Sequence, residues 1–232
     1  MRVVRTTLAE QVASELVERI ERMALRPGDP IPPESQLAED FGVNRLVVRE
    51  AIRMLAAREI LVSSQGRQAR VSTPSARVLA QMLDFRVRQE SLSLEDVIQT
   101  RRLVECEVAR LAARRVRSGE AGVTETAALL EAMSGAVDDR DKFVDLDVKF
   151  HAAISEAAGA ELLRLILTSF ETILLRARRS TYDARAARGE GHEVTLRAHR
   201  SILAAIEAGD EQGAAAAMEE HLQETKRDIP PQ

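Results

Sequence analysis

The last two-thirds of the chain carry apolar residues at helical spacing. No run alternates apolar and polar residues as a half-buried strand would. Breaks between the apolar stretches fall at short segments rich in Ser, Gly or Asp, and prolines are confined to the two ends of this part. The pattern predicts helices over residues 77–88, 94–117, 124–137, 141–158, 160–182, 190–208 and 211–227. Helices in this number without a strand favour a helical bundle.

The first 75 residues predict several short elements of different kinds. They predict a helix over 7–25 capped by Thr6 or Thr7, a Pro/Gly-rich loop over 26–33, a helix over 34–42 closed by Gly42, a helix over 45–59 capped by Asn44, and a β-hairpin turning at 65–68. Two short helices joined by a tight turn and followed by a hairpin form a winged helix-turn-helix. We therefore expect a mainly α protein with two domains, a winged helix-turn-helix over 1–75 and an all-helical bundle over 76–232, joined near 71–76.

A winged helix-turn-helix places the N-terminal residues of its second helix against base edges in the major groove. Here those residues are Asn44, Arg45 and Arg49. The two arginines are four residues apart, so they share a helix face, and Arg suits both guanine edges and phosphates. A solvated helix face is the alternative interpretation.

Charge and composition restrict the other classes of function. Residues 1–75 have a net charge of +1 and residues 76–232 a net charge of −5, so a local patch must carry any DNA binding. There is neither a membrane-spanning apolar run nor a signal peptide, and we expect a cytoplasmic protein with no membrane partner. The single Cys106 lies among apolar residues, which indicates a small core residue.

Three of the four histidines are placed so that helices would bring them together. Asp147 and His151 are one turn apart on one helix face. His199 lies ten residues before Gly209 and His221 twelve after it, so a helical hairpin turning there would hold both at about the same height, roughly 15–18 Å from the turn. An Asp/His/His/His set inside a bundle is suited to a transition metal. His192 is expected at the surface or rim.

The first domain resembles the DNA-binding domain of the GntR family of bacterial transcription regulators. The residues that carry the likeness are GDPIPPESQLAEDFGVNRLVVREAIRMLAAREIL. The resemblance implies DNA contacts at Arg45 and Arg49 and a wing tip at Gly66. Ser35 and Gln68 depart from an arginine and a glycine that are usual in the family, and Arg67 and Arg70 would partly compensate for the missing cation.

The second domain resembles the FCD effector-binding domain of the FadR-like branch of this family. The likeness rests on IQTRRLVECEVARLAA, LDVKFHAAISEAAG, AHRSILAAIEAGD and MEEHL. It implies metal ligands at Asp147, His151, His199 and His221, with Arg101 opening an R-x-x-x-E pattern. Two minor departures are Ala160 in place of a frequent asparagine and Ala198 in place of a frequent glutamate.

Together these features predict a DNA-binding transcription regulator, a repressor, rather than an enzyme. A homodimer would bind a pseudo-palindromic double-stranded operator. A small carboxylic acid, held by a divalent metal and Arg101, would be the effector. Zinc is the expected metal, with nickel or manganese as alternatives. A surface salt bridge is the alternative role for Arg101. A metal sensor, a purely structural metal and a metal-dependent enzyme are the rival functions.

Overall fold

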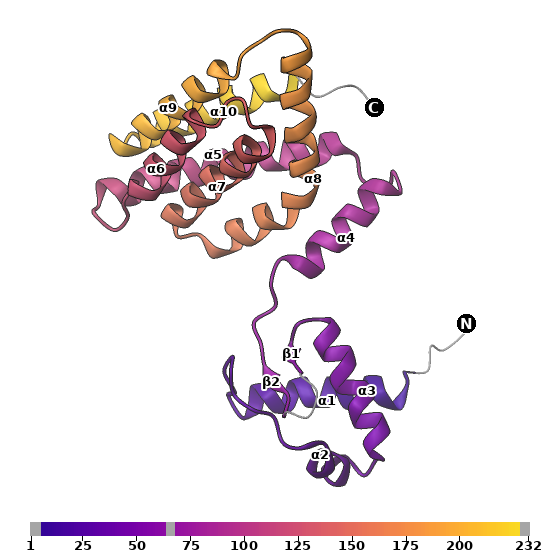
Figure 1. The fold of residues 1–232 in the computed structure, drawn as a ribbon. Helices are drawn as coiled ribbons and strands as arrows, with labels where there is room; N and C mark the ends of the chain where they lie inside the picture. Colours follow the sequence, from indigo (N-terminus) through magenta and orange to yellow (C-terminus); the bar gives the residue numbers. More distant parts are fainter. Residues whose placement is uncertain (1–5, 64–67, 228–232) are drawn as a thin grey trace. The chain divides into compact units, whose positions relative to one another are not determined.

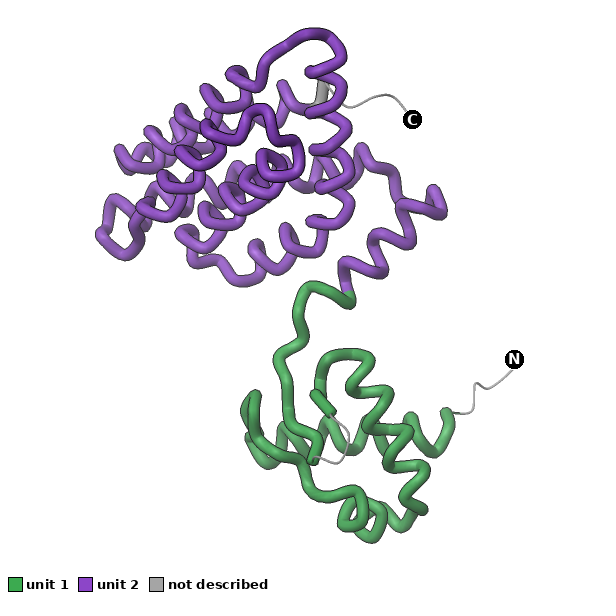
Figure 2. Tube along the Cα trace, viewed as in Figure 1, with its two compact units in different colours: residues 1–78 green, residues 79–232 purple. Residues whose placement is uncertain are grey.

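The computed structural model describes residues 6–63 and 68–227. Gly66 and Arg67, the predicted wing-tip residues, lie outside these ranges. The chain forms two compact units, residues 1–78 and residues 79–232, each with its own hydrophobic core (Figure 2).

The first unit is the predicted winged helix-turn-helix (Figure 1). It contains α1 (Leu8–Arg22), α2 (Glu34–Phe41), α3 (Arg45–Ala57), β1 (Leu61–Val62) and β2 (Arg70–Val71). The two strands pair antiparallel, with Leu61 opposite Val71. The first helix ends three residues earlier than predicted, because the backbone turns into the left-handed region at Ala24.

Local capping explains where these helices begin and end. Thr7 and Glu10 form a capping box at the start of α1. Gly42, with a φ of 64°, closes α2 in the left-handed conformation that glycine adopts without strain. The Asn44 side chain accepts a hydrogen bond of 3.0 Å from the backbone N–H of Val47 at the start of α3. Gly42 and Asn44 therefore fix where the chain turns from α2 into α3.

The Pro/Gly-rich loop before α2 pairs with the wing. The backbone N–H of Ile31 donates to the carbonyl of Ala69 at 3.0 Å, and that of Val71 donates to Asp29 at 2.9 Å. The side-chain amide of Gln68 donates to the carbonyl of Ile31. Gln68, which departs from the usual glycine of the family, thus ties the base of the wing to this loop.

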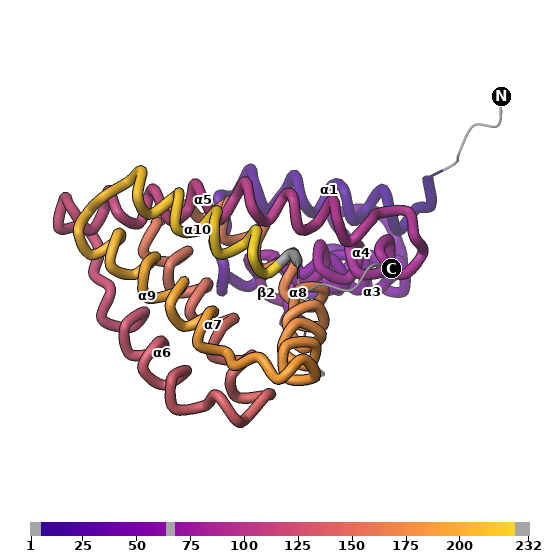
Figure 3. The backbone as a smooth tube through the Cα atoms, turned by 90° about the horizontal axis from the view of Figure 1, so that it is seen from above, coloured from indigo at the N-terminus to yellow at the C-terminus, as the bar shows by residue number. Residues whose placement is uncertain are grey.

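The second unit is the predicted helical bundle (Figures 1 and 3). Its helices are α4 (Arg77–Arg88, which begins at the end of the first unit), α5 (Leu94–Arg117), α6 (Thr124–Ser134), α7 (Arg140–Ala158), α8 (Glu161–Ala187), α9 (Glu193–Glu207) and α10 (Glu211–Arg227). The predicted helix over 160–182 ended five residues before α8 does, and the predicted helix over 190–208 began three residues before α9. The chain leaves α8 only at Gly189, whose φ is 70°, and α9 starts after Gly191.

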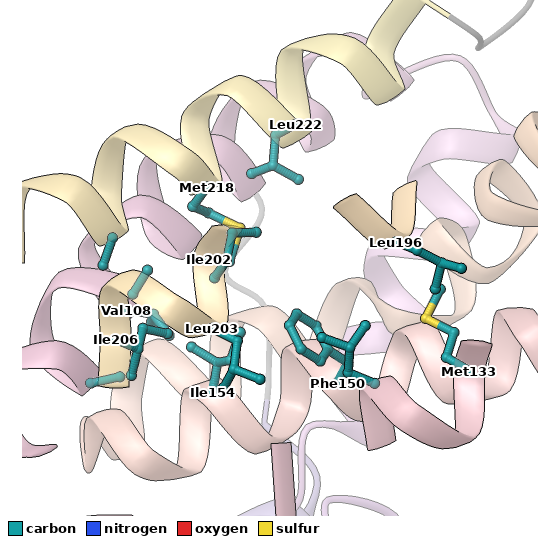
Figure 4. Close-up of a cluster of buried hydrophobic side chains, with 14 of the residues drawn as sticks. Val108, Met133, Phe150, Ile154, Leu196, Ile202, Leu203, Ile206, Met218 and Leu222 are labelled. Atoms are coloured by element: carbon teal, nitrogen blue, oxygen red, sulfur yellow. The ribbon is translucent and has the colours of Figure 1, made fainter. Parts of the chain in front are cut away.

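Helices α5, α7, α9 and α10 pack around one core, and α6 covers α7 and α9 (Figure 3). The fully buried residues of this core include Phe150, Ile154, Ile202 and Met218, which lie together in Figure 4. Helix α8 lies against α7 and α5. Its first half contributes to a smaller apolar cluster with Val97. Throughout 6–63 and 68–227, no helix is long and apolar enough to cross a membrane.

Candidate metal centre and DNA-binding helix

Three helices bring the four predicted ligands together. Asp147 and His151 come from one face of α7, His199 from α9 and His221 from α10. The predicted α9–α10 hairpin is confirmed, and Gly209 ends α9 with a φ of 66°. All four side chains are buried, and their ligand atoms lie within 4.8 Å of one another.

The distances within this cluster suit a shared cation. The Nε2 atoms of His199 and His221 are 3.3 Å apart, and Nε2 of His199 is 3.4 Å from Oδ1 of Asp147. Two donors at the usual 2.0–2.1 Å from one zinc ion, at angles near 90–109°, would be about 2.9–3.4 Å apart. The donor set therefore fits a divalent transition metal in both chemistry and spacing.

The protonation states also suit metal binding. Burial lowers the pKa of His199 to about 3 and lowers the pKa of His221 well below its ordinary value. Both imidazoles are thus neutral near pH 7, which is the form that binds metals. Burial alone would raise the pKa of Asp147, but the adjacent Arg178 guanidinium outweighs it and holds that pKa below its usual range. Asp147 is therefore ionised near pH 7, the form in which a carboxylate binds a metal.

Glu105 on α5 joins His151 to Arg101. One carboxylate oxygen pairs with Nδ1 of His151 and the other with Nε of Arg101. The Glu105 carboxylate beside Nδ1 favours a ring proton on that nitrogen over one on Nε2, which leaves the Nε2 lone pair for a metal. The alternative role of Arg101 as a surface salt bridge is wrong, because Arg101 is 6% exposed and its Nη2 lies 3.5 Å from Nε2 of His151.

Arg178 on α8 was not predicted as a site residue. Its side chain is 9% exposed, and its guanidinium pairs with Oδ2 of Asp147, leaving Oδ1 facing His199. Arg178 stands in an arginine-rich segment that looks solvated in the sequence. The sequence held one sign that Arg178 points inward. It follows the apolar residues Phe170 and Leu174 at four-residue intervals, so the three share one helix face.

Aromatic packing fixes two of the histidine rings. His199 stacks on Phe150 with ring centroids 4.3 Å apart, and its Nδ1 finds no hydrogen-bond partner in the described parts of the chain.

The prediction of a surface or rim position for His192 is wrong. His192, at the start of α9, is 9% exposed, because its ring stacks on Tyr182 of α8 with centroids 3.9 Å apart.

Two cavities adjoin the centre. The larger, of about 120 Å³, is bordered by Glu105, His151, Ser155 and Arg178. The smaller, of about 40 Å³, is bordered by Arg101, Asp147, Arg178 and His221, and it extends along α8 and α9. A small molecule in either cavity would lie beside the predicted ligands and a buried guanidinium.

The predicted base-reading residues lie on the surface of the first unit. Arg45 and Arg49 are exposed on one face of α3. Nη2 of Arg49 is 3.1 Å from the Glu34 carboxylate at the start of α2, an exposed pair that water and salt weaken. The side-chain Oδ1 of Asn44 accepts the hydrogen bond that caps α3. This face is thus accessible to a partner, with Arg49 held beside α2.

Both units of the chain match models of known protein families. Residues 8–71 match the family model for bacterial regulatory proteins of the gntR family, and residues 96–224 match the FCD domain. The chain is 30% identical to the HTH-type transcriptional repressor NanR of Enterobacter sp. (strain 638) over 223 residues, covering 94% of this chain and 84% of that protein. NanR of Cronobacter sakazakii (strain ATCC BAA-894) is also 30% identical, over 229 residues, with the same coverage.

A solved structure extends the likeness to the fold. The Streptococcus agalactiae GntR protein superposes with a TM-score of 0.60 at 28% identity, over 94% of this chain and 99% of that chain. Both family models thus match in their expected order along one chain. The protein belongs to the GntR family of bacterial transcription regulators, in the branch whose C-terminal domain is an FCD domain, and not to a family of enzymes.

Proposed function

We propose that this regulator is a repressor whose operator binding responds to a small organic acid held at a metal centre in the FCD domain. The observation that carries the proposal is the buried Asp/His/His/His cluster, with the guanidinium groups of Arg101 and Arg178 beside it. The related NanR proteins are named as repressors, which supports the direction of control. The protein would act in the bacterial cytoplasm, on the nucleoid.

The proposed operator-binding face is α3, with Asn44, Arg45 and Arg49 toward the bases. Gly66 and Arg67, which lie outside the described residues, are proposed as further DNA contacts. Support comes from the exposed, shared face of the two arginines. Replacing a base-reading arginine costs about 1–3 kcal/mol of specific binding. Gel-shift titration on the operator should therefore show weaker binding by Arg45→Ala and Arg49→Ala. Arg22→Ala, on α1, is the control, and undiminished affinity in both α3 variants would contradict this assignment.

The metal centre consists of Asp147, His151, His199 and His221, with zinc as the proposed ion and nickel or manganese as alternatives. A bound divalent ion would supply positive charge and coordination positions beyond the four protein ligands. Elemental analysis should find about one metal per chain in the wild type and much less in His199→Ala. Full occupancy in the variant would show that the metal lies elsewhere.

The charges around the centre favour an anionic effector. The buried carboxylates of Asp147 and Glu105 balance the guanidiniums of Arg101, which is buried, and of Arg178, whose side chain is 9% exposed, and His199 and His221 are neutral. A divalent ion then adds uncompensated positive charge, which a carboxylate would neutralise. Arg101 is placed to pair with such an acid if it exchanges part of its contact with Glu105.

Thermal-shift assays test the effector. Small carboxylic acids should raise the melting temperature of metal-loaded protein and not of chelator-stripped protein, because ligands that bind only the native state stabilise it by mass action. Arg101→Gln should retain the metal and lose this shift. A response to the metal alone, with none to any acid, would favour a metal sensor, and no change in operator binding on metal removal would favour a structural ion.

We also propose a homodimer, so that two winged domains bind the two halves of a pseudo-palindrome. Helix α4 offers an apolar surface for a second copy, since Met82 and Phe85 are more than half exposed on it. Light scattering should report a dimer without DNA, and Phe85→Glu should weaken it. A wild-type monomer at micromolar concentration would contradict the proposal.

A further inference from the structure

The smaller cavity continues along α8 beyond the metal centre. Arg178, Thr181 and Arg185 border it at spacings of three and four residues, so they share one face of the helix. At 1.5 Å per residue, Arg185 lies about 10 Å farther along the helix axis than Arg178. The same cavity thus has one end at Asp147 and His221 and a second polar region near the end of α8.

Thr181 is the unexplained group in this region. Its side chain is buried, and its hydroxyl has no hydrogen-bond partner in the part of the chain that the structure describes. Other helical threonines here bond back to the carbonyl four residues earlier, as Thr100 does to Asp96 at 2.8 Å and Thr225 to His221 at 2.9 Å. A buried hydroxyl left without such a bond carries a free-energy cost, which a ligand oxygen in the cavity would remove.

Arg185 and Thr195 supply further polar atoms beside Thr181. Arg185 is 5% exposed, and its Nη1 donates to Oγ1 of Thr195 on α9 at 3.1 Å. The stacked rings of Tyr182 and His192 line the same cavity. This combination of a buried guanidinium, two hydroxyls and a flat aromatic wall is a built site that recognises oxygen-rich groups.

We propose that Thr181, Arg185 and Thr195 form a second ligand subsite. It accepts a hydroxyl or a second carboxylate at the far end of an acid whose first carboxylate lies at the metal centre. The inference rests on the proposed function and narrows its effector class to hydroxy acids and dicarboxylic acids, and it excludes simple monocarboxylic acids as the preferred ligands.

Calorimetric titration of metal-loaded protein with acids of matched chain length tests the subsite. Butyrate and succinate form a four-carbon set, and hexanoate, adipate and gluconate form a six-carbon set. In at least one set the acid with the second polar group should bind about tenfold tighter than the monocarboxylate, since it adds a hydrogen bond to a buried partner. Thr181→Val should abolish this preference, and Thr181→Ser should retain it.

Two further measurements separate binding from folding. Metal content and melting temperature without ligand should not fall in Thr181→Val, because the hydroxyl has no protein partner to lose. Thr100→Val, which removes a back-bonded hydroxyl on α5 away from the cavity, should leave the preference among acids unchanged. Acids that bind without preference, or a preference that survives Thr181→Val, would overturn the subsite alone. If no acid binds the metal-loaded wild type, the acid effector of the proposed function fails as well.

Discussion

The Glu105 carboxylate contacts two residues of the predicted site at the same time. It is 3% exposed and pairs at once with Arg101 and with Nδ1 of His151. Burial alone would raise the pKa of Glu105, but the Arg101 guanidinium and the neighbouring His151 hold it well below the usual range, so the group stays ionised. One carboxylate therefore lies beside both a predicted metal ligand, His151, and the proposed acid-binding arginine.

We expect Glu105→Gln to weaken metal binding by about 10–100-fold, because the outer partner of a ligating histidine fixes its tautomer and orientation. Competition against a chromophoric chelator measures the affinity. Glu107→Gln is the matched control, since Glu107 is on the same helix and pairs with the more exposed Arg110. Equal metal affinity in Glu105→Gln and wild type would show that His151 does not depend on this contact.

Cys106 provides a prediction about reactivity. Burial, reinforced by a hydrogen bond from the thiol to Glu219, raises the pKa of Cys106 from 9.0 to about 12. The thiolate is the reactive form, so at pH 8 the native thiol should be about a thousandfold less ionised than an unperturbed one. A colorimetric disulfide reagent should react slowly with native protein and rapidly in denaturant. Similar rates in both conditions would contradict this environment.

At the scale of elements, the α9–α10 hairpin brings together two of the predicted metal ligands, His199 and His221. Gly209 adopts a φ of 66°, and a Cβ placed there would be 2.7 Å from Cβ of Arg117 on α5. Gly119, with a φ of 75°, would meet no described atom within 4 Å. The turn of the hairpin is thus packed against the last residue of α5, whereas Gly119, in the loop after α5, has no such contact.

These two glycines form a matched pair for denaturation experiments. Gly119→Ala should cost about 1–2 kcal/mol of unfolding free energy, the penalty of a left-handed non-glycine residue. Gly209→Ala should cost about 1–3 kcal/mol more, because overpacking is added to the same backbone strain. Equal losses in urea titrations would mean that Arg117 moves aside without cost.

At the scale of the whole molecule, the two units have separate cores and all four predicted metal ligands lie in the second. Metal removal should therefore loosen one unit only. At free metal near 100 times the dissociation constant, binding stabilises that unit by about 2.7 kcal/mol. Hydrogen exchange after chelation should rise in α7, α9 and α10 and stay unchanged in α1–α3, with His199→Ala as a variant already insensitive to chelator. Equal increases in both units would contradict independent cores.

Local features of the sequence by themselves determined most of the fold. The capping residues Thr7 and Asn44, the closing glycine Gly42 and the turn glycine Gly209 act over a few neighbouring residues, so their effects can be read without tertiary contacts. The hairpin at Gly209 then placed His199 and His221 at matching heights, and simple helix geometry predicted that they would meet.

Tertiary structure alone decided which charged and polar side chains are buried. Arg178 and Arg185 stand in a segment whose sequence is typical of a solvated helix, yet both are interior because α7 supplies Asp147 and α9 supplies Thr195. A contact between elements also buries His192, whose ring stacks on Tyr182 of α8. An arginine remains inside a protein only where another element provides its partner, and a single helix does not contain that information.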